Sequence, residues 1–92
     1  MLPGIEWDPE KARRNNNKHG IEFTEAVTAL EDDYAVTIEE LHSGEIRFIT
    51  IGLSDSGKIL VVVYTFRGNV VRLISARQAT PKERKFYEKD KA

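Results

Sequence analysis

The chain has 92 residues, of which 40% are hydrophobic and 32% charged, and it contains no cysteine. This size and composition fit one domain over residues 1–92, and they exclude two separate cores, a disordered chain, disulfides and thiolate metal sites. The longest apolar run begins at Ile59 and is far shorter than the ~20 residues that cross a bilayer. The first residues lack the charged and apolar regions of a signal peptide, so we expect a cytoplasmic protein with no membrane contact.

The net charge of −1 conceals an uneven distribution of charged residues. Residues 1–57 have five Lys/Arg and twelve Asp/Glu, whereas residues 58–92 have nine Lys/Arg and three Asp/Glu. These counts give −7 for the first part and +6 for the second. Such a separation allows a positive face that binds an anionic partner. Internal pairing between the two halves is the alternative, and composition alone leaves both open.

The N-terminal part predicts a short strand followed by two helices. Residues 5–7 alternate in polarity, and Asp8 and Pro9 then supply an N-cap and a first helical residue. This helix should stop near residue 18 or 19, since Gly20 favours the left-handed conformation. One of its faces is polar and carries Lys11, Arg14, Asn15 and Lys18. A second helix, over about residues 24–31, has apolar spacing at Phe23, Ala26, Val27 and Leu30.

The remainder of the chain predicts four strands and a final helix. Apolar residues favour strands over 35–39, 45–53, 59–66 and 70–77, of which the third is apolar on both faces and therefore central. Thr80, Pro81 and Glu83 form a helix start with a capping box. The predicted order is β-α-α-β-β-β-β-α. This is an α+β fold in which an antiparallel meander sheet carries two N-terminal helices and one C-terminal helix.

Several sequence blocks together resemble the BrnT family, in order and over nearly the whole chain. They comprise residues 6–11, 15, 18–20, 23–26, 47–52, 61–64, 72–77, 83, 84 and 87. The resemblance implies a RelE-like fold and a toxin of a type II toxin–antitoxin system that cuts RNA without a metal or other cofactor and thereby arrests translation. It also implies a BrnA-like antitoxin partner, through which the chain would contact DNA only indirectly. A homodimer and a heterotetramer with the antitoxin both remain open.

Two arginines on the last predicted strand are the first candidates for phosphate binding. Arg72 and Arg77 have planar forks that suit phosphate oxygens and a pentavalent phosphorane. Strict alternation places them on opposite faces of a strand, so a β-bulge is needed before both can face one phosphate. The alternative is that Arg72 lies on a solvated face and that Arg77 pairs with an early carboxylate such as Glu6 or Asp8.

His19 and Lys18 complete the predicted catalytic set. His19 has an unperturbed pKa near ~6.5 and could exchange a proton at neutral pH, but a histidine before a helix-ending glycine is also an ordinary cap. Lys18 either binds phosphate or is solvated. Further candidates for RNA contact are Lys11, Arg47, Arg67, Arg84 and Tyr64. Tyr64 could stack on a base or belong to the core, and the two isolated histidines predict no metal site.

Two other functions are compatible with the same sequence. The chain could be a non-catalytic, toxin-like module that serves as partner or co-repressor of a DNA-binding antitoxin. It could also be a small RNA-binding domain with no toxin role. The sequence does not separate these alternatives from a nuclease.

Overall fold

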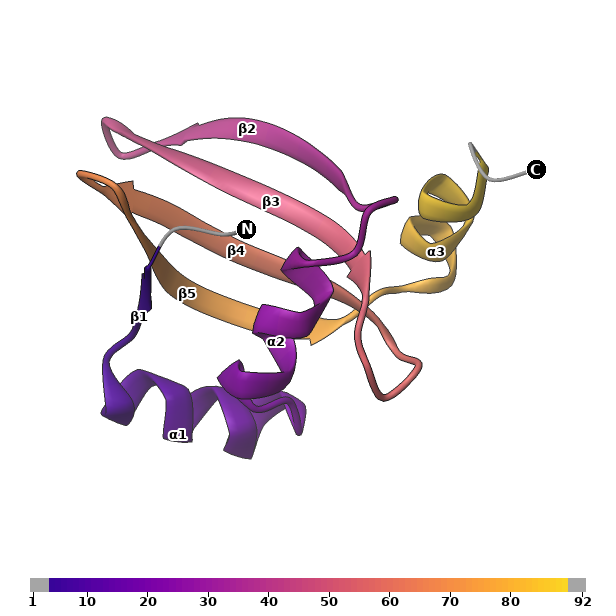
Figure 1. Cartoon of the computed structure of the whole chain (residues 1–92), viewed down its shortest axis with the longest axis horizontal. Helices are drawn as coiled ribbons and strands as arrows, with labels where there is room; N and C mark the ends of the chain where they lie inside the picture. Colours follow the sequence, from indigo (N-terminus) through magenta and orange to yellow (C-terminus); the bar gives the residue numbers. More distant parts are fainter. Residues whose placement is uncertain (1–3, 90–92) are drawn as a thin grey trace.

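The computed structural model describes residues 4–89 and contains five strands and three helices within that range (Figure 1). They are β1 (Ile5–Glu6), α1 (Pro9–His19), α2 (Phe23–Leu30), β2 (Val36–His42), β3 (Glu45–Leu53), β4 (Ile59–Arg67), β5 (Val70–Gln78) and α3 (Pro81–Lys89). The predicted element order is confirmed, with most boundaries within one or two residues. In this part of the chain, no helix combines the length and hydropathy that a membrane crossing requires.

The five strands form one mixed sheet in the order β1-β5-β4-β3-β2. Strands β2 to β5 are joined as antiparallel neighbours, as the meander predicted. The prediction of a wholly antiparallel sheet is wrong at β1, which pairs in parallel with β5 through Ile5 opposite Val71 and Glu6 opposite Arg72. No hairpin links these two strands, because two helices and three strands separate them in the chain, so turn geometry does not impose an antiparallel direction. Strand β4 is central, as predicted.

Local signals explain where α1 begins and ends. The Asp8 side chain accepts a hydrogen bond of 2.9 Å from the backbone N–H of Glu10, which satisfies a donor at the open N-terminus. Gly20 adopts a φ of 71°, and its N–H donates to the Asn16 carbonyl at 2.8 Å. A residue with a Cβ would be strained at this φ, so glycine fixes the end of the helix and directs the chain into α2.

We call the sheet face that packs against α1 and α2 the covered face. Trp7 meets Phe23 edge to face at a centroid distance of 5.8 Å, and both pack in the core of this face. At Gly52, an added Cβ would lie 2.3 Å from the Ala29 carbonyl oxygen, so α2 approaches β3 more closely than any side chain permits. The buried core on this face consists of Ile21, Phe23, Ala26, Ala29, Leu60, Val62, Val71, Leu73 and Ala76.

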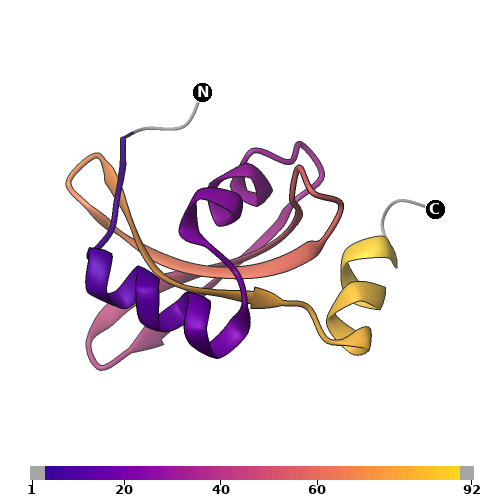
Figure 2. The same ribbon diagram turned by 90° about the horizontal axis from the view of Figure 1, so that it is seen from below.

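We call the opposite side of the sheet the open face. Only α3 packs against it within the described residues, and Figures 1 and 2 show this helix at one end of the sheet, apart from α1 and α2. Tyr87 is the buried residue of α3, and it packs with Ile51 and Val61. Its hydroxyl donates a hydrogen bond to Asp32, and burial together with this carboxylate raises the pKa of Tyr87 to about 12. One aromatic side chain therefore holds much of α3 in place.

Candidate nucleic-acid interface

A β-bulge in β5 decides how the two predicted phosphate-binding arginines are oriented. Val63 pairs with Ser75 but Tyr64 pairs with Leu73, which leaves Ile74 as an extra residue in β5. Arg72 therefore lies opposite Thr65 and Arg77 opposite Val61. Because these β4 partners are four residues apart, both arginines face the same side of the sheet. The bulge that the sequence argument required is present.

The two guanidinium groups nevertheless do not meet at one point. A separation of four residues along β4 places their backbones about 13 Å apart, and each guanidinium group is paired with a carboxylate of a different element, β1 or α3. Arg72 donates to the Glu6 carboxylate at 2.8 Å, so its partner comes from the strand paired with it in parallel. This ion pair joins β1 to β5 and is partly exposed. The two arginines, which the sequence analysis grouped at one phosphate, are therefore held by separate carboxylates in this structure.

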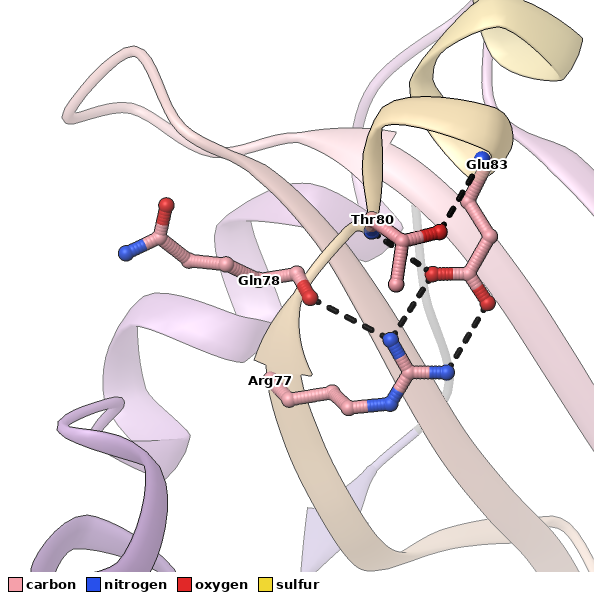
Figure 3. Close-up of polar contacts among 4 residues, drawn as sticks. All are labelled: Arg77, Gln78, Thr80 and Glu83. Atoms are coloured by element: carbon pink, nitrogen blue, oxygen red, sulfur yellow. Dashed lines mark hydrogen bonds and ion pairs between the residues drawn. The ribbon is translucent and has the colours of Figure 1, made fainter.

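Arg77 is held by a carboxylate from α3 (Figure 3). Its two terminal nitrogens donate to the two carboxylate oxygens of Glu83 at 2.8 Å each, in the bidentate geometry of strong ion pairs. Glu83 also accepts from the Thr80 N–H, and its own N–H donates to the Thr80 hydroxyl, which closes the predicted capping box. The Arg77 hydrogen bonds are the main reason that the pKa of Glu83 is lowered to about 2. Of the alternatives, pairing of Arg77 is the one observed, but with Glu83 rather than Glu6 or Asp8.

The outer side of α1 forms a shallow cavity of about 240 Å³ against the bulged part of β5. We call it the basic groove, since four of its lining side chains are cationic or can become so. Ile74 and Ser75 form the strand side of the groove. The hydroxyl of Ser75 makes no hydrogen bond with another described residue. The helix side consists of Lys11, Arg14, Asn15, Lys18 and His19.

Asn15 explains why α1 lies along this part of β5. Strand β1 pairs with β5 only at Val71 and Arg72, so the later residues of β5 lack a neighbouring strand on that side. The buried Asn15 amide replaces that strand: Nδ2 donates to the Ala76 carbonyl at 2.9 Å, and the Ala76 N–H donates to Oδ1 at 3.0 Å. Nδ2 also donates to the Ile21 carbonyl at 2.9 Å. This side chain therefore fixes the groove between helix and strand.

His19 lies in the basic groove, which neither Arg72 nor Arg77 lines. It is the last residue of α1, half-buried, and it lines the basic groove together with Lys18 and Ser75. The C-terminal cap hydrogen bond of this helix comes from the Gly20 backbone rather than from the imidazole. The groove thus brings together three predicted residues, Lys11, Lys18 and His19, beside the strand that carries Arg72 and Arg77.

The remaining RNA-contact candidates lie elsewhere on the molecule. Arg47 bonds to Glu45 on β3 at 3.3 Å, Arg67 is exposed at the end of β4, and Arg84 is exposed on α3. Tyr64 packs with the core of the covered face, stacks on Phe48 at 5.7 Å, and its hydroxyl shares a hydrogen bond with Thr50. Of the two interpretations of Tyr64, the structure therefore matches a core residue with a satisfied hydroxyl. Arg14 and Ser75 line the groove but were not among the predicted site residues. Helix periodicity placed Arg14 on the polar face of α1, whereas the place of Ser75 depends on where in β5 the bulge lies.

A second cavity of about 490 Å³ lies on the open face beside the first, and we call it the apolar groove. Ser75 lines both grooves, and Arg77 lines the apolar one. Within residues 4–89, no group of three or more His, Cys, Asp or Glu side chains is arranged to hold a metal ion. The apolar groove is lined by Ile38, Ile49, Ile51, Val61, Val63, Ser75, Arg77, Lys82, Glu83 and Phe86.

Comparisons with known proteins agree with the sequence resemblance. The family model described as "Ribonuclease toxin, BrnT, of type II toxin-antitoxin system" matches residues 7–83. The crystal structure of the Brucella abortus ribonuclease toxin BrnT matches with a TM-score of 0.64 and 24% sequence identity. The match covers 87% of this chain and 99% of the Brucella chain, and at this identity it shows a shared fold. No curated protein sequence matches the chain.

Proposed function

The chain belongs to the BrnT family of ribonuclease toxins of type II toxin–antitoxin systems, and on that premise we propose that it is a metal-independent endoribonuclease. It cleaves RNA at the basic groove, arrests translation and is neutralised by a BrnA-like antitoxin. The main observation that supports this proposal is the basic groove. Asn15 fixes one helix face against the bulge of β5, so that Lys11, Arg14, Lys18 and His19 line the groove opposite Ser75, whose hydroxyl makes no hydrogen bond with another described residue.

The proposed reaction is an attack of the ribose 2′-oxygen on the adjacent phosphorus. The 2′-oxygen loses its proton, a new P–O bond forms, and the bond to the 5′-oxygen breaks as that oxygen gains a proton. The imidazole of His19 is suited to act as general base or general acid in one of these transfers. Lys18, Lys11 and Arg14 stabilise the negative charge on the phosphorane, and Ser75 donates a hydrogen bond to a phosphate oxygen.

Arg72 and Arg77 have a different part in this proposal from that of the groove residues. Each is already paired with a carboxylate, and about 13 Å separates them along the strand. We therefore assign them to RNA phosphates on either side of the cleaved bond. Arg47, Arg67 and Arg84 add to the positive potential at longer range.

The test compares His19→Ala and Lys18→Ala with the wild-type chain on labelled RNA in the presence of EDTA. His19→Ala should lower the cleavage rate by roughly 10²–10⁴ with little change in RNA affinity. Lys18→Ala should weaken RNA binding and reduce the slope of log K against log salt by about 1. His42→Ala, at an exposed hairpin position, is the matched control and should behave as wild type. Wild-type cleavage by His19→Ala, or loss of wild-type cleavage in EDTA, would contradict the proposal.

A second candidate function is a non-catalytic partner or co-repressor of a DNA-binding antitoxin. The observation that favours it is that Arg72 and Arg77 already form ion pairs with Glu6 and Glu83, which compete with phosphate binding. In that case the wild-type chain would leave RNA intact and would not arrest growth when expressed alone. It would still increase the affinity of the antitoxin for its operator DNA.

A further inference from the structure

The apolar groove exposes hydrophobic side chains from four separate elements to solvent. Ile38 of β2 and Phe86 of α3 form opposite walls and are 53% and 51% exposed. Ile49, Ile51 and two β4 valines form the floor. Contiguous apolar surface of this kind on a small domain is typical of interaction sites, and within residues 4–89 no further element lies over it.

The chemistry of the walls favours protein side chains over RNA. Branched aliphatic residues make up most of the lining, with Phe86 as its aromatic member. Nucleobases bind proteins mainly by stacking on aromatic rings and by hydrogen bonds along their edges, and isoleucine and valine offer neither. Leucine, isoleucine or phenylalanine side chains of a partner would instead bury apolar surface on both sides.

The charges around the groove select the kind of partner. Lys82 lines it and makes no ion pair with another described residue, whereas Glu83 is neutralised by Arg77. Helix α3 has four Lys/Arg and two Glu within Pro81–Lys89. A two-fold dimer through this groove would bring two such cationic helices together, which disfavours a second copy of the chain. Carboxylates beside the apolar anchors of a partner would instead be attracted.

The position of the groove connects it to the proposed RNA site. Ser75 lines both cavities, and Arg77 lines the apolar groove, where it is paired with Glu83 of α3. A segment seated in the apolar groove therefore covers Ser75 and Arg77 and restricts RNA access to the neighbouring basic groove. Neutralisation would follow without any change in the fold of the chain.

We propose that the apolar groove is the docking site of the antitoxin, which inserts apolar side chains of an acidic amphipathic segment between Ile38 and Phe86. This inference rests on the proposed function, because that function supplies the antitoxin as a partner. The probe is the purified product of the antitoxin reading frame that neighbours the gene of this chain. Binding is measured by calorimetry with the full-length chain, and RNA cleavage is measured separately.

Two variants remove the proposed anchors from opposite walls, Ile38→Glu and Phe86→Ala. Each should weaken antitoxin binding at least tenfold and leave RNA cleavage within twofold of wild type. Leu41→Glu is the matched control, since Leu41 is 74% exposed on the same strand β2 but faces the other side of the sheet. It should bind antitoxin as wild type does. Thermal unfolding by circular dichroism shows whether each variant is folded.

A second pair of variants tests the acidic character of the partner. Lys82→Glu and Lys85→Glu make the same charge change on α3, but only Lys82 lines the groove. Lys82→Glu should weaken antitoxin binding several-fold more than Lys85→Glu, with the difference largest at low salt. Equal losses of antitoxin affinity in the two variants would contradict the proposal that the partner segment is acidic.

Three results would overturn the docking site as a whole. The first is that the folded variants Ile38→Glu and Phe86→Ala bind the antitoxin as tightly as wild type does. The variants could lose RNA affinity instead, which would assign the groove to RNA. The wild-type chain could be a dimer that Ile38→Glu converts to a monomer with unchanged antitoxin affinity, which would assign it to a second copy. If the wild-type chain cuts no RNA while antitoxin binding still depends on Ile38, the proposed nuclease fails and the docking site stands.

Discussion

The covered and open faces of the sheet differ in how completely their side chains are packed. On the covered face, Leu60, Val62 and Leu73 are almost inaccessible to solvent beneath α1 and α2. On the open face, Ile49 of β3 and Val63 of β4 have the same kind of side chain, but they line a cavity. The covered face therefore provides most of the buried apolar surface, whereas the open face, apart from the cluster of Ile51, Val61 and Tyr87, leaves apolar and charged side chains available for partners.

The largest expected effect compares one truncation on each face. Leu60→Ala removes a fully buried side chain and should lower the free energy of unfolding by about 3 kcal/mol, through lost burial and a new cavity. Ile49→Ala removes a half-buried side chain of the open face and should lower it by about 1 kcal/mol, because less apolar surface is buried there. Urea denaturation of both variants measures the two losses. Equal losses would mean that the open face contributes to folding as much as the covered face.

A somewhat smaller effect is expected where α1 joins the covered face to the edge of β5. Asn15→Ala removes three hydrogen bonds and leaves the N–H and C=O of the buried Ala76 without these partners. The expected loss is about 2 kcal/mol of unfolding free energy. Asn17→Ala is the control, since Asn17 is exposed on the same helix, and it should change stability by less than about 0.5 kcal/mol. An equal loss of unfolding free energy in both variants would show that Asn15 does not hold α1 against β5.

The smallest expected effect concerns the ion pair that attaches α3 to the open face. The pKa of Glu83 is about 2 in the folded chain and 4.5 in its reference state, chiefly because Arg77 donates hydrogen bonds to its carboxylate. Because this pKa is lowered in the folded chain, the ionised Glu83 carboxylate stabilises the fold at pH values above about 4.5. This contribution to stability is lost as the pH falls from about 4.5 towards 2. Glu83→Gln should therefore lower stability by about 1 kcal/mol at pH 7, since solvent partly screens the pair.

The pH dependence checks this assignment. The stability difference between wild type and Glu83→Gln, measured by urea denaturation, should shrink steadily between pH 5 and pH 2.5. A difference that stays constant over this range would show that the carboxylate charge of Glu83 is not its source.

The sequence predicted the elements well because their signals are local. Asp8 with Pro9, and Thr80 with Glu83, mark the helix starts through contacts within a few residues, and both caps are observed. Gly20 marks a helix end for the same reason. The all-apolar pattern of residues 59–66 predicted the central position of β4 correctly.

The relations between distant segments could not be predicted in the same way. The direction of β1 depends on which edge of the sheet it joins, and two residues carry too little pattern to decide this. The bulge at Ile74 depends on the register of two strands rather than on the composition of one. The extra residue shifts the alternation of side chains by one position, so Arg72 before the bulge and Arg77 after it lie on the same face of the sheet.

The candidate site was predicted only in part, because some of its residues are grouped by local periodicity and others by contacts between distant segments. Helix periodicity correctly grouped Lys11, Arg14 and Lys18, because positions three and four apart lie on one face. The contribution of Ser75 and the pairing of Arg77 with Glu83 arise only when strand, bulge and final helix are assembled. Roles assigned to these residues in RNA cleavage remain predictions that the His19 and Lys18 variants test.

The backbone-like hydrogen bonds of Asn15 have one more consequence, for the growth of the sheet. An exposed strand edge invites pairing with other chains, and proteins protect themselves by covering it. A single amide group and one helix cover the later part of β5, whereas the outer edge of β2 has no strand beside it in the described sheet. Because β1 at the opposite edge has only two residues, the seven residues of β2 offer a foreign strand the longer edge for pairing, and the acidic pair Glu39 and Glu40 discourages indiscriminate self-association there.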